Sequence, residues 1–215
     1  MKIEIGRDRP SNFAEHWPGQ YEVFSHFEYA AGIPHALFAV TTLKENGLPN
    51  VSFHAWSCFQ GDGGGFFAIL AGIYKHTHTY ANIKRTPEFC VNFLSADWYD
   101  SLKATIERNA DGEDEFAAGG FTVEPPTAIS APRIAESFLC LECRLKSISD
   151  ISGAGISALV VGEVLNIAAD GDFALGLDQK YGEKGFMFNI HSPKNLITGE
   201  GERTGVATLE VRRTC

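Results

Sequence analysis

The chain has 215 residues, 44% of them hydrophobic and 21% charged, which is enough apolar material for a packed core and excludes global disorder. Lys and Arg number 18 against 27 Asp and Glu, a net charge of -9, so binding to nucleic acid or to anionic lipid is not expected. No stretch approaches the roughly 18 consecutive apolar residues that a membrane span needs.

The cysteines and the N-terminal residues indicate the compartment. Five cysteines are scattered at positions 58, 90, 140, 143 and 215, and the first residues lack the apolar segment of a signal peptide. Free thiols without a secretion signal predict a cytoplasmic protein. Cys140 and Cys143 have the spacing of a redox or zinc pair, but they interrupt an apolar run that reads as a strand. Because residues three apart on a strand face opposite sides, we interpret both as ordinary strand residues.

The first third of the chain predicts an N-terminal arm followed by strands. Residues 1–23 are mixed in character and residues 24–31 favour a helical turn. Residues 36–43, 50–58 and 66–71 are rich in β-branched and aromatic side chains, and Asn46–Gly47 is typical of a hairpin turn. These three segments predict a β-meander.

The middle of the chain predicts two short helices and one strand. A helix over residues 78–85 should end at Thr86, because the residue before a proline disfavours helix. A strand follows at 88–94, and residues 99–108 have helical spacing of apolar side chains. The acidic run at 111–115 is interpreted as a solvated loop.

Two long strands are expected later, at residues 136–148 and 157–167. The second is apolar on both faces and should therefore lie centrally in a sheet. Six strands at short spacing with two short helices predict a mainly β fold built on an antiparallel barrel, which hides its strand edges.

The start of the helix at 78–85 is a candidate anion site. The first N–H groups of a helix lack partners within the helix, and its dipole favours a negative charge there. Thr77 and Thr79 could hold a phosphate and Lys75 could supply the counter-charge. The alternative is a capped surface helix without a ligand, which is the commoner arrangement.

The order of motifs resembles that of the flavin reductase-like family, the FMN-binding split barrels that include flavin reductases and flavoredoxins. The segments that carry the resemblance are 40–42, 50–51, 79–83, 86–92, 132–137, 141–143 and 160–164. The resemblance implies a six-stranded antiparallel Greek-key split barrel over residues 31–170, an N-terminal arm over 1–30, and an extension over 171–215 that packs on the barrel or on a dimer partner.

The resemblance also implies a homodimer and an FMN site. The FMN phosphate would lie near Lys75, Thr77 and Thr79. The ribityl chain and the flavin ring would lie along a second group of residues, and Asn82 completes the expected set. That second group comprises Asn50, Ser52, Phe53, His54 and Trp56.

The implied function is that of an NAD(P)H-dependent flavin reductase, with NADH or NADPH as co-substrate and no catalytic side chain, because the flavin supplies the chemistry. Such an enzyme works alone or passes reduced flavin to an oxygenase or another redox protein. The alternatives are a flavoredoxin-like FMN electron carrier without NAD(P)H activity, a metal-binding barrel that uses His54, His76 and His78, and a flavin-free interaction module.

Overall fold

The computed structural model describes residues 1–176, 181–191, 194–201 and 205–212. Its residues form two compact units. The first unit contains Met1–His35 and residues from Phe188 to Ala207, and the second contains Ala36–Met187 and the described residues after Ala207. Among the described helices, none combines the length and apolar character needed to cross a membrane. The domain limits expected at residues 30 and 170 stay predictions.

The described part of the first unit has two short helices and one antiparallel pair of strands. Helix α1 spans Gln20–Val23 and α2 spans His26–Ala31, the latter at the predicted helical turn. Ser25 caps α2 because its hydroxyl accepts the N–H of Phe27 at 3.2 Å. Strands β10 (Met187–Ile190) and β11 (Gly205–Ala207) pair antiparallel.

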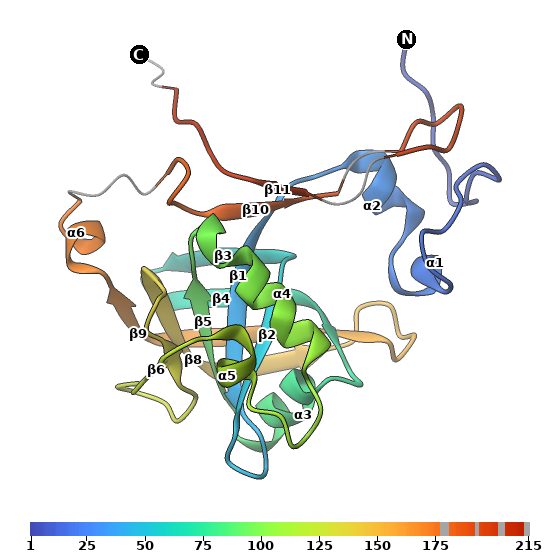
Figure 1. The fold of residues 1–215 in the computed structure, drawn as a ribbon. Coiled ribbons are helices and arrows are strands. Elements are labelled where there is room, and N and C mark those ends of the chain that lie inside the picture. The colour runs from blue at the N-terminus through green and yellow to red at the C-terminus, as the bar shows by residue number, and fades with distance from the viewer. Residues whose placement is uncertain (177–180, 192–193, 202–204, 213–215) are drawn as a thin grey trace. The chain divides into compact units, whose positions relative to one another are not determined.

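The second unit is an antiparallel barrel-like sheet (Figure 1). Its strands follow the order β2-β1-β5-β8-β9-β4-β3, and a separate short pair is formed by β6 (Val123–Glu124) and β7 (Arg133–Ile134). The strands of the main sheet are β1 (His35–Leu43), β2 (Pro49–His54), β3 (Ser57–Asp62), β4 (Gly65–Tyr74), β5 (Glu88–Phe93), β8 (Leu139–Ser149) and β9 (Ser157–Ala169). As predicted, β9 lies centrally, between β8 and β4.

One predicted strand is divided in the structure. The segment 50–58 breaks between β2 and β3, where Trp56 has a φ of 46°. A residue in this left-handed region cannot continue the pleat of a strand. Opposite the corner, β4 carries an irregularity between Leu70 and Ile73 with Gly72 at φ 71°, and the N–H of Ala71 donates to the carbonyl of Trp56 at 2.8 Å.

The corner changes the connectivity as well as the strand count. β2 pairs with β1, β3 pairs with β4, and β4 then pairs with β9. Both pairings of the predicted meander are therefore present, but the chain turns a barrel corner at Trp56, so the two pairings are made by separate strands of the middle segment. The sheet of the second unit consequently has seven strands in its described part, and six were expected.

In the described residues of the second unit, four helices and a 3-10 turn accompany the sheet. Helix α3 spans His78–Arg85, with the predicted bounds, and α4 spans Tyr99–Glu107 after the 3-10 turn η1 (Ala96–Trp98). Helix α5 spans Glu115–Gly119 and α6 spans Gly171–Ala174. Helices α3, α4 and α5 all pack against β2.

The acidic run at 111–115 is only partly the solvated loop that was predicted. Asp111 is exposed, but Glu115 begins α5 and is 1% exposed. Its carboxylate is neutralised by a lysine that lies far away in the sequence, as described below. The expectation of a solvated loop is therefore wrong for Glu115, because tertiary contacts supply the counter-charge that its burial requires.

The core lies between the inward faces of the strands. Phe38, Phe89, Leu70 and Val160 are fully buried there, and Ile83 adds the apolar side of α3. Of the two cysteines of β8, Cys143 belongs to this core cluster. Cys140 and Cys143 are buried free thiols, which confirms their interpretation as strand residues; Cys215 lies outside the described residues.

Gly162 of β9 allows the closest packing in this core. A Cβ atom at this position would lie 2.4 Å from Cζ of Phe89 and 3.0 Å from Cβ of Cys143. Because Phe89 is fully buried, its ring has no free space to enter. We expect Gly162→Ala to lower the free energy of unfolding by about 1–3 kcal/mol, measured by urea denaturation. Gly171→Ala is the matched control, since nothing lies within 4 Å of its added Cβ; equal effects of the two variants would contradict this packing.

Candidate functional site

The second unit contains a cavity of about 420 Å³ beside the N-terminus of α3, within the size range of small-molecule sites. Strand β2, the end of β4 and helices α3, α4 and α5 contribute to its walls. The lining residues are Asn50, Val51, Ser52, Phe53, Tyr74, His76, Thr77, His78, Thr79, Thr105, Ile106, Asn109 and Glu115. Five of the nine residues predicted from the sequence to bind the cofactor are among them, namely Asn50, Ser52, Phe53, Thr77 and Thr79.

Thr77 is the N-cap of α3. Its hydroxyl accepts the N–H of Tyr80 at 3.3 Å and donates to the carbonyl of Tyr74 at 2.7 Å. In the described part of the chain, nothing accepts a hydrogen bond from the N–H of His78 or of Thr79. The helix therefore keeps two free backbone donors and the positive end of its dipole at the edge of the cavity.

Asn50 and Thr79 join β2 to α3. Nδ2 of Asn50 donates to Oγ1 of Thr79 at 3.0 Å, and both side chains are 3% exposed. Asn82 lies one turn further along α3 and does not line the cavity. Its Nδ2 donates to Oγ1 of Thr42 at 3.0 Å, so Asn82 fastens the helix to β1.

Lys75 does not line the cavity either. Its Nζ lies 2.6 Å from Oδ2 of Asp150. The hydrogen bond from Lys75, with those from the N–H groups of Gly155 and Gly153, lowers the pKa of Asp150 to about 2 against the opposing effect of desolvation. The charge of Lys75 is thus already matched by a carboxylate in this structure.

His54 and Trp56 lie away from the cavity lining, at the corner between β2 and β3. His54 is 7% exposed and meets the ring of Phe38 edge to face at 5.5 Å. Burial lowers the pKa of His54 to about 4, although a hydrogen bond with the backbone of Ala71 opposes the shift. The imidazole is therefore neutral at pH 7.

The cavity does receive the other two histidines of the metal hypothesis. His76 stacks on Tyr74 with ring centroids 5.8 Å apart, and Nε2 of His78 lies 2.8 Å from Oδ1 of Asp111. His54 is not on the same wall, and no group of three or more metal-ligating side chains comes together within the described residues. Nothing in the described part of the chain therefore supports the metal-binding hypothesis.

The buried carboxylate of Glu115 forms the floor of the cavity and belongs to an ion pair that sequence reasoning missed. Oε1 of Glu115 lies 2.9 Å from Nζ of Lys44, and Oε2 accepts the N–H of Val51 at 2.6 Å. Lys44 is 5% exposed, and its Nζ also donates to the carbonyls of Ala110 and Glu113, both at 2.9 Å. Desolvation raises the pKa of Glu115, and the hydrogen bonds from Lys44 and Val51 oppose that shift.

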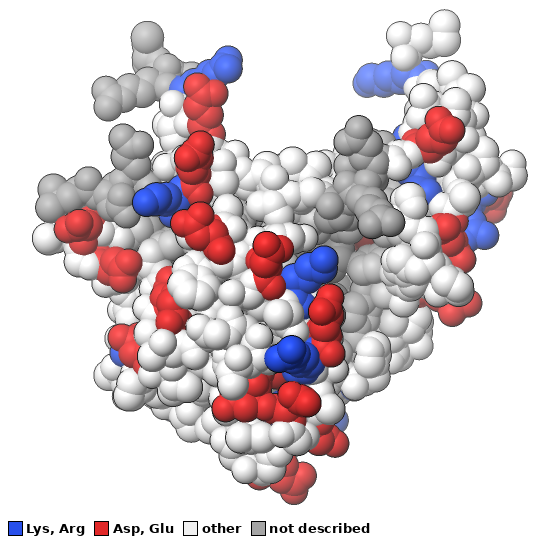
Figure 2. Space-filling model, in the orientation of Figure 1, with Lys and Arg blue, Asp and Glu red and all other residues white. Residues whose placement is uncertain are grey.

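The surface charge agrees with the composition. Figure 2 shows Asp and Glu spread over the face drawn, with Lys and Arg between them and no large basic patch on that face. An anion in the cavity would therefore be bound by backbone N–H groups, hydroxyls and imidazoles.

The sequence of the chain matches the model of the flavin reductase like domain over residues 31–183, which is most of its length. This chain belongs to the flavin reductase-like family. The match includes every residue that lines the cavity. Membership of this family makes flavin binding the first function to test.

Solved structures of similar fold confirm the split barrel for this flavin reductase-like protein. A proposed flavin reductase with a split barrel domain from Shewanella frigidimarina has a TM-score of 0.74 at 17% identity, covering 99% of this chain and 98% of its own. Nitrilotriacetate monooxygenase component B from Bacillus cereus has a TM-score of 0.73 at 14% identity, with full coverage of both chains. Flavoredoxin from Methanosarcina acetivorans has a TM-score of 0.68 at 16% identity, covering 94% and 95%.

A curated relative was found in sequence as well. An uncharacterized protein of Aquifex aeolicus (strain VF5) is 26% identical over 116 residues, or 53% of this chain. The matched part spans 59% of the length of that relative. At these identities the comparisons establish the fold and the family, while the flavin, the electron donor and the partner belong to the proposal that follows.

Proposed function

We propose that this protein binds FMN and is an NAD(P)H-dependent flavin reductase, which passes a hydride from a nicotinamide to the flavin. The observation that carries the proposal is the 420 Å³ cavity, where the N-terminus of α3 meets the polar and aromatic residues of β2. An FMN site needs an anion-binding end, hydrogen-bonding groups along its middle and an apolar wall for the ring. All three are present on the cavity lining.

Each wall has a part in this proposal. The free N–H groups of His78 and Thr79 would take the phosphate, with the helix dipole in support. Asn50 and Ser52 would hydrogen-bond the ribityl chain. Phe53, whose ring meets Tyr99 edge to face at 5.6 Å, would give the flavin ring an apolar surface.

In the proposed reaction, the side chains of the cavity position the flavin. The bound flavin supplies the redox chemistry, since it accepts a hydride from the nicotinamide. The residues of the cavity hold and orient it, and alignment of two rings can contribute several kcal/mol to a hydride transfer. Glu115 is held by Lys44 and Val51, so no side-chain acid or base is assigned to the reaction.

The test is anaerobic reduction of the FMN-loaded protein. Purified protein should be yellow or should bind added FMN, and NADH or NADPH should then bleach the flavin absorbance. Flavin binding without bleaching would identify the second candidate, a flavoredoxin-like electron carrier, which the fold of the Methanosarcina acetivorans flavoredoxin keeps open. Protein that binds no flavin at all would sink both.

Two substitutions locate the phosphate. Thr79→Val removes a buried hydroxyl and leaves Asn50 without its partner, and we expect the Kd for FMN to rise roughly tenfold or more. Lys75→Ala removes a cation that is already paired with Asp150, so the Kd should change less than about threefold. Fluorescence titration of FMN measures both values. The opposite ranking would return the phosphate to Lys75, where the sequence first placed it.

The remaining parts of the proposal concern assembly. We propose a cytoplasmic homodimer that passes reduced flavin to an oxygenase or another redox protein. The fold is similar to that of component B of a nitrilotriacetate monooxygenase. This similarity of fold is the support for an oxygenase partner. Sedimentation of the FMN-loaded protein tests the dimer.

A further inference from the structure

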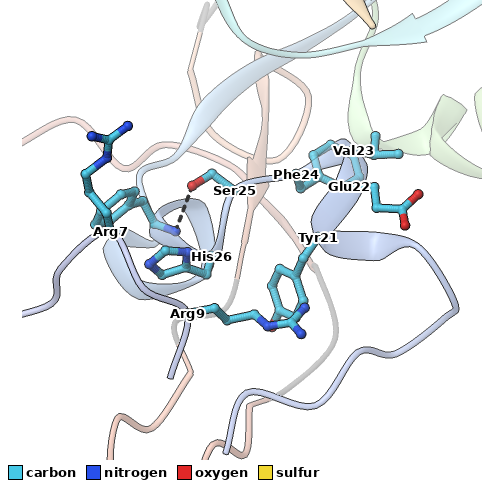
Figure 3. A pocket seen from close by; sticks show the side chains of 9 residues that line it. Arg7, Arg9, Tyr21, Glu22, Val23, Phe24, Ser25 and His26 are labelled. Carbon is cyan, nitrogen blue, oxygen red and sulfur yellow. Dashed lines mark hydrogen bonds between the residues drawn. The ribbon is translucent and has the colours of Figure 1, made fainter. Parts of the chain in front are cut away.

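A second cavity, of about 480 Å³, lies wholly within the first unit and has no part in the proposed flavin site. Figure 3 shows the side chains that line it. They come from the segment before α1, from α1 and from the start of α2. The lining residues are Arg7, Arg9, Tyr21, Glu22, Val23, Phe24, Ser25, His26 and Phe27.

Two guanidinium groups give this cavity a positive edge in an acidic protein. Arg7 forms no ion pair or hydrogen bond with the side chains and backbone described for this chain. Cζ of Arg9 lies 4.8 Å from the centroid of the Tyr21 ring. Among the described residues its one ion pair is with Glu15, and this pair is long at 3.5 Å and largely exposed. In Figure 3, Arg9 reaches across to Tyr21, whereas the guanidinium of Arg7 points in the opposite direction and the carboxylate of Glu22 points away from both arginines. Most of the donors of both guanidinium groups therefore remain available for an anion.

Aromatic rings form the rest of the wall. His26 stacks on Phe27 with centroids 4.4 Å apart and planes 29° apart, and its Nε2 lies 2.9 Å from the carbonyl of Gly6. This contact ties the arginine-bearing segment to α2. Phe24 lines the cavity as well, so a planar apolar group would find ring surfaces to contact.

The hydroxyl of Tyr21 is a second, independent indication that a ligand binds in this cavity. Its hydroxyl oxygen is buried, yet it has no hydrogen-bond partner among the described residues. A buried hydroxyl without a partner costs free energy, roughly 1–3 kcal/mol. Since Tyr21 lines the cavity beneath Arg9, an anionic ligand atom at this place could satisfy the hydroxyl and the guanidinium together.

We propose that this cavity binds a small molecule that consists of a planar ring carrying an anionic group. Nucleotides and aromatic carboxylates are the two sources of that chemistry. The anion would be held by Arg9 beside the Tyr21 hydroxyl, because a guanidinium suits bidentate contacts to phosphate or carboxylate, and the ring would lie against the aromatic wall. The proposal does not depend on flavin binding, because none of the residues involved lines the cavity of the second unit.

The test is isothermal titration calorimetry of the full-length protein with 5′-AMP, benzoate, adenosine and inorganic phosphate. AMP or benzoate should bind with a 1:1 stoichiometry. Tighter binding of AMP would identify a nucleotide as the ligand, and tighter binding of benzoate would identify an aromatic carboxylate. Adenosine and inorganic phosphate should each bind at least tenfold more weakly than AMP, because each lacks one half of the recognised group. Equal binding of AMP and adenosine, or no binding of either AMP or benzoate at millimolar concentration, would overturn the proposal.

Matched variants assign the binding to this cavity. Arg9→Gln should weaken the tighter ligand roughly tenfold, the effect of one lost charge-assisted hydrogen bond, whereas Arg7→Gln should have a smaller effect because its guanidinium points away from Arg9. Tyr21→Phe removes only a hydroxyl that has no partner among the described residues, so it keeps the fold and should weaken the ligand even if loss of the Tyr21 contact disturbs Arg9→Gln. Arg212→Gln, an 86% exposed arginine of the second unit, should bind as the wild type does. If Thr79→Val abolishes binding while Arg9→Gln does not, the ligand occupies the other cavity and the proposal is wrong.

Discussion

Replacing Lys44 with methionine is expected to lower the free energy of unfolding by about 3–5 kcal/mol. The substitution keeps the apolar stem but removes the cation that faces Oε1 of Glu115 at 2.9 Å. The carboxylate is 1% exposed and would be left as an uncompensated buried charge on the cavity floor. Its pKa is already raised by desolvation, so in the variant it should take up a proton at higher pH. Urea denaturation at pH 7 measures the loss.

The double variant Lys44→Met, Glu115→Leu separates the charge effect from packing. Removing both partners avoids the isolated carboxylate, so the double variant should recover a large part of the lost stability. The Val51 N–H loses its acceptor in this variant, which keeps the recovery incomplete. Lys146→Met is the surface control, because its pair with Glu163 spans 3.7 Å and is exposed, and its effect should stay below about 1 kcal/mol. A double variant as unstable as Lys44→Met would show that packing dominates.

Glu142→Gln should be the second strongly destabilised variant, with a loss of about 3 kcal/mol. Glu142 is fully buried on β8. Its two carboxylate oxygens accept hydrogen bonds from the N–H groups of Thr127 and Ala128, from Nδ2 of Asn166 and from Nη1 of Arg133. A glutamine keeps the shape but has one acceptor oxygen and turns an amide NH₂ toward these donors. Glu163→Gln, on the partly exposed side of β9, is the matched control and should have little effect.

The same carboxylate predicts a dependence on pH. Desolvation would raise the pKa of Glu142, but the hydrogen bonds from Thr127, Ala128 and Asn166, and the charge of Arg133, outweigh it and lower the pKa below 4.5. A lowered pKa in the folded state means that the stabilisation is present above about pH 4.5 and is lost as the pH falls through the folded-state pKa. The stability difference between the wild type and Glu142→Gln should therefore be largest near neutral pH and shrink in acid. A difference independent of pH would contradict the ionised state of Glu142.

Local signals in the sequence were enough for most elements. The bounds of α3 follow from its cap at Thr77 and from Thr86–Pro87 at its other end, both of which act within a few residues. The central place of β9 follows from apolar side chains on both faces. The division of residues 50–58 at Trp56 could not be predicted from local signals. Gly72 and Ala71, on the separate strand β4, determine where the sheet turns its corner.

The candidate site was predicted in part for the same reason. Thr77 and Thr79 lie at a helix start and were visible there, whereas Asn50 was implied by the resemblance to the family, and the cavity brings them together. Lys75 was selected because it is close in sequence, but the structure pairs it with Asp150, 75 positions away. Glu115 was hidden in an acidic run that is typical of a surface loop.

The sequence by itself determined the family, the main strands of the sheet apart from their division at Trp56, helices α3 and α4, and the place of a helix start suited to an anion. These features depend on periodicity, capping and turn residues, which act over short distances along the chain. Only the tertiary structure decided which charges are already matched: Lys75 with Asp150, and Lys44 with Glu115 on the cavity floor. The physical reason is that a pairing of buried or half-buried charges depends on distance in space, and the sequence positions of the partners carry no local sign of it.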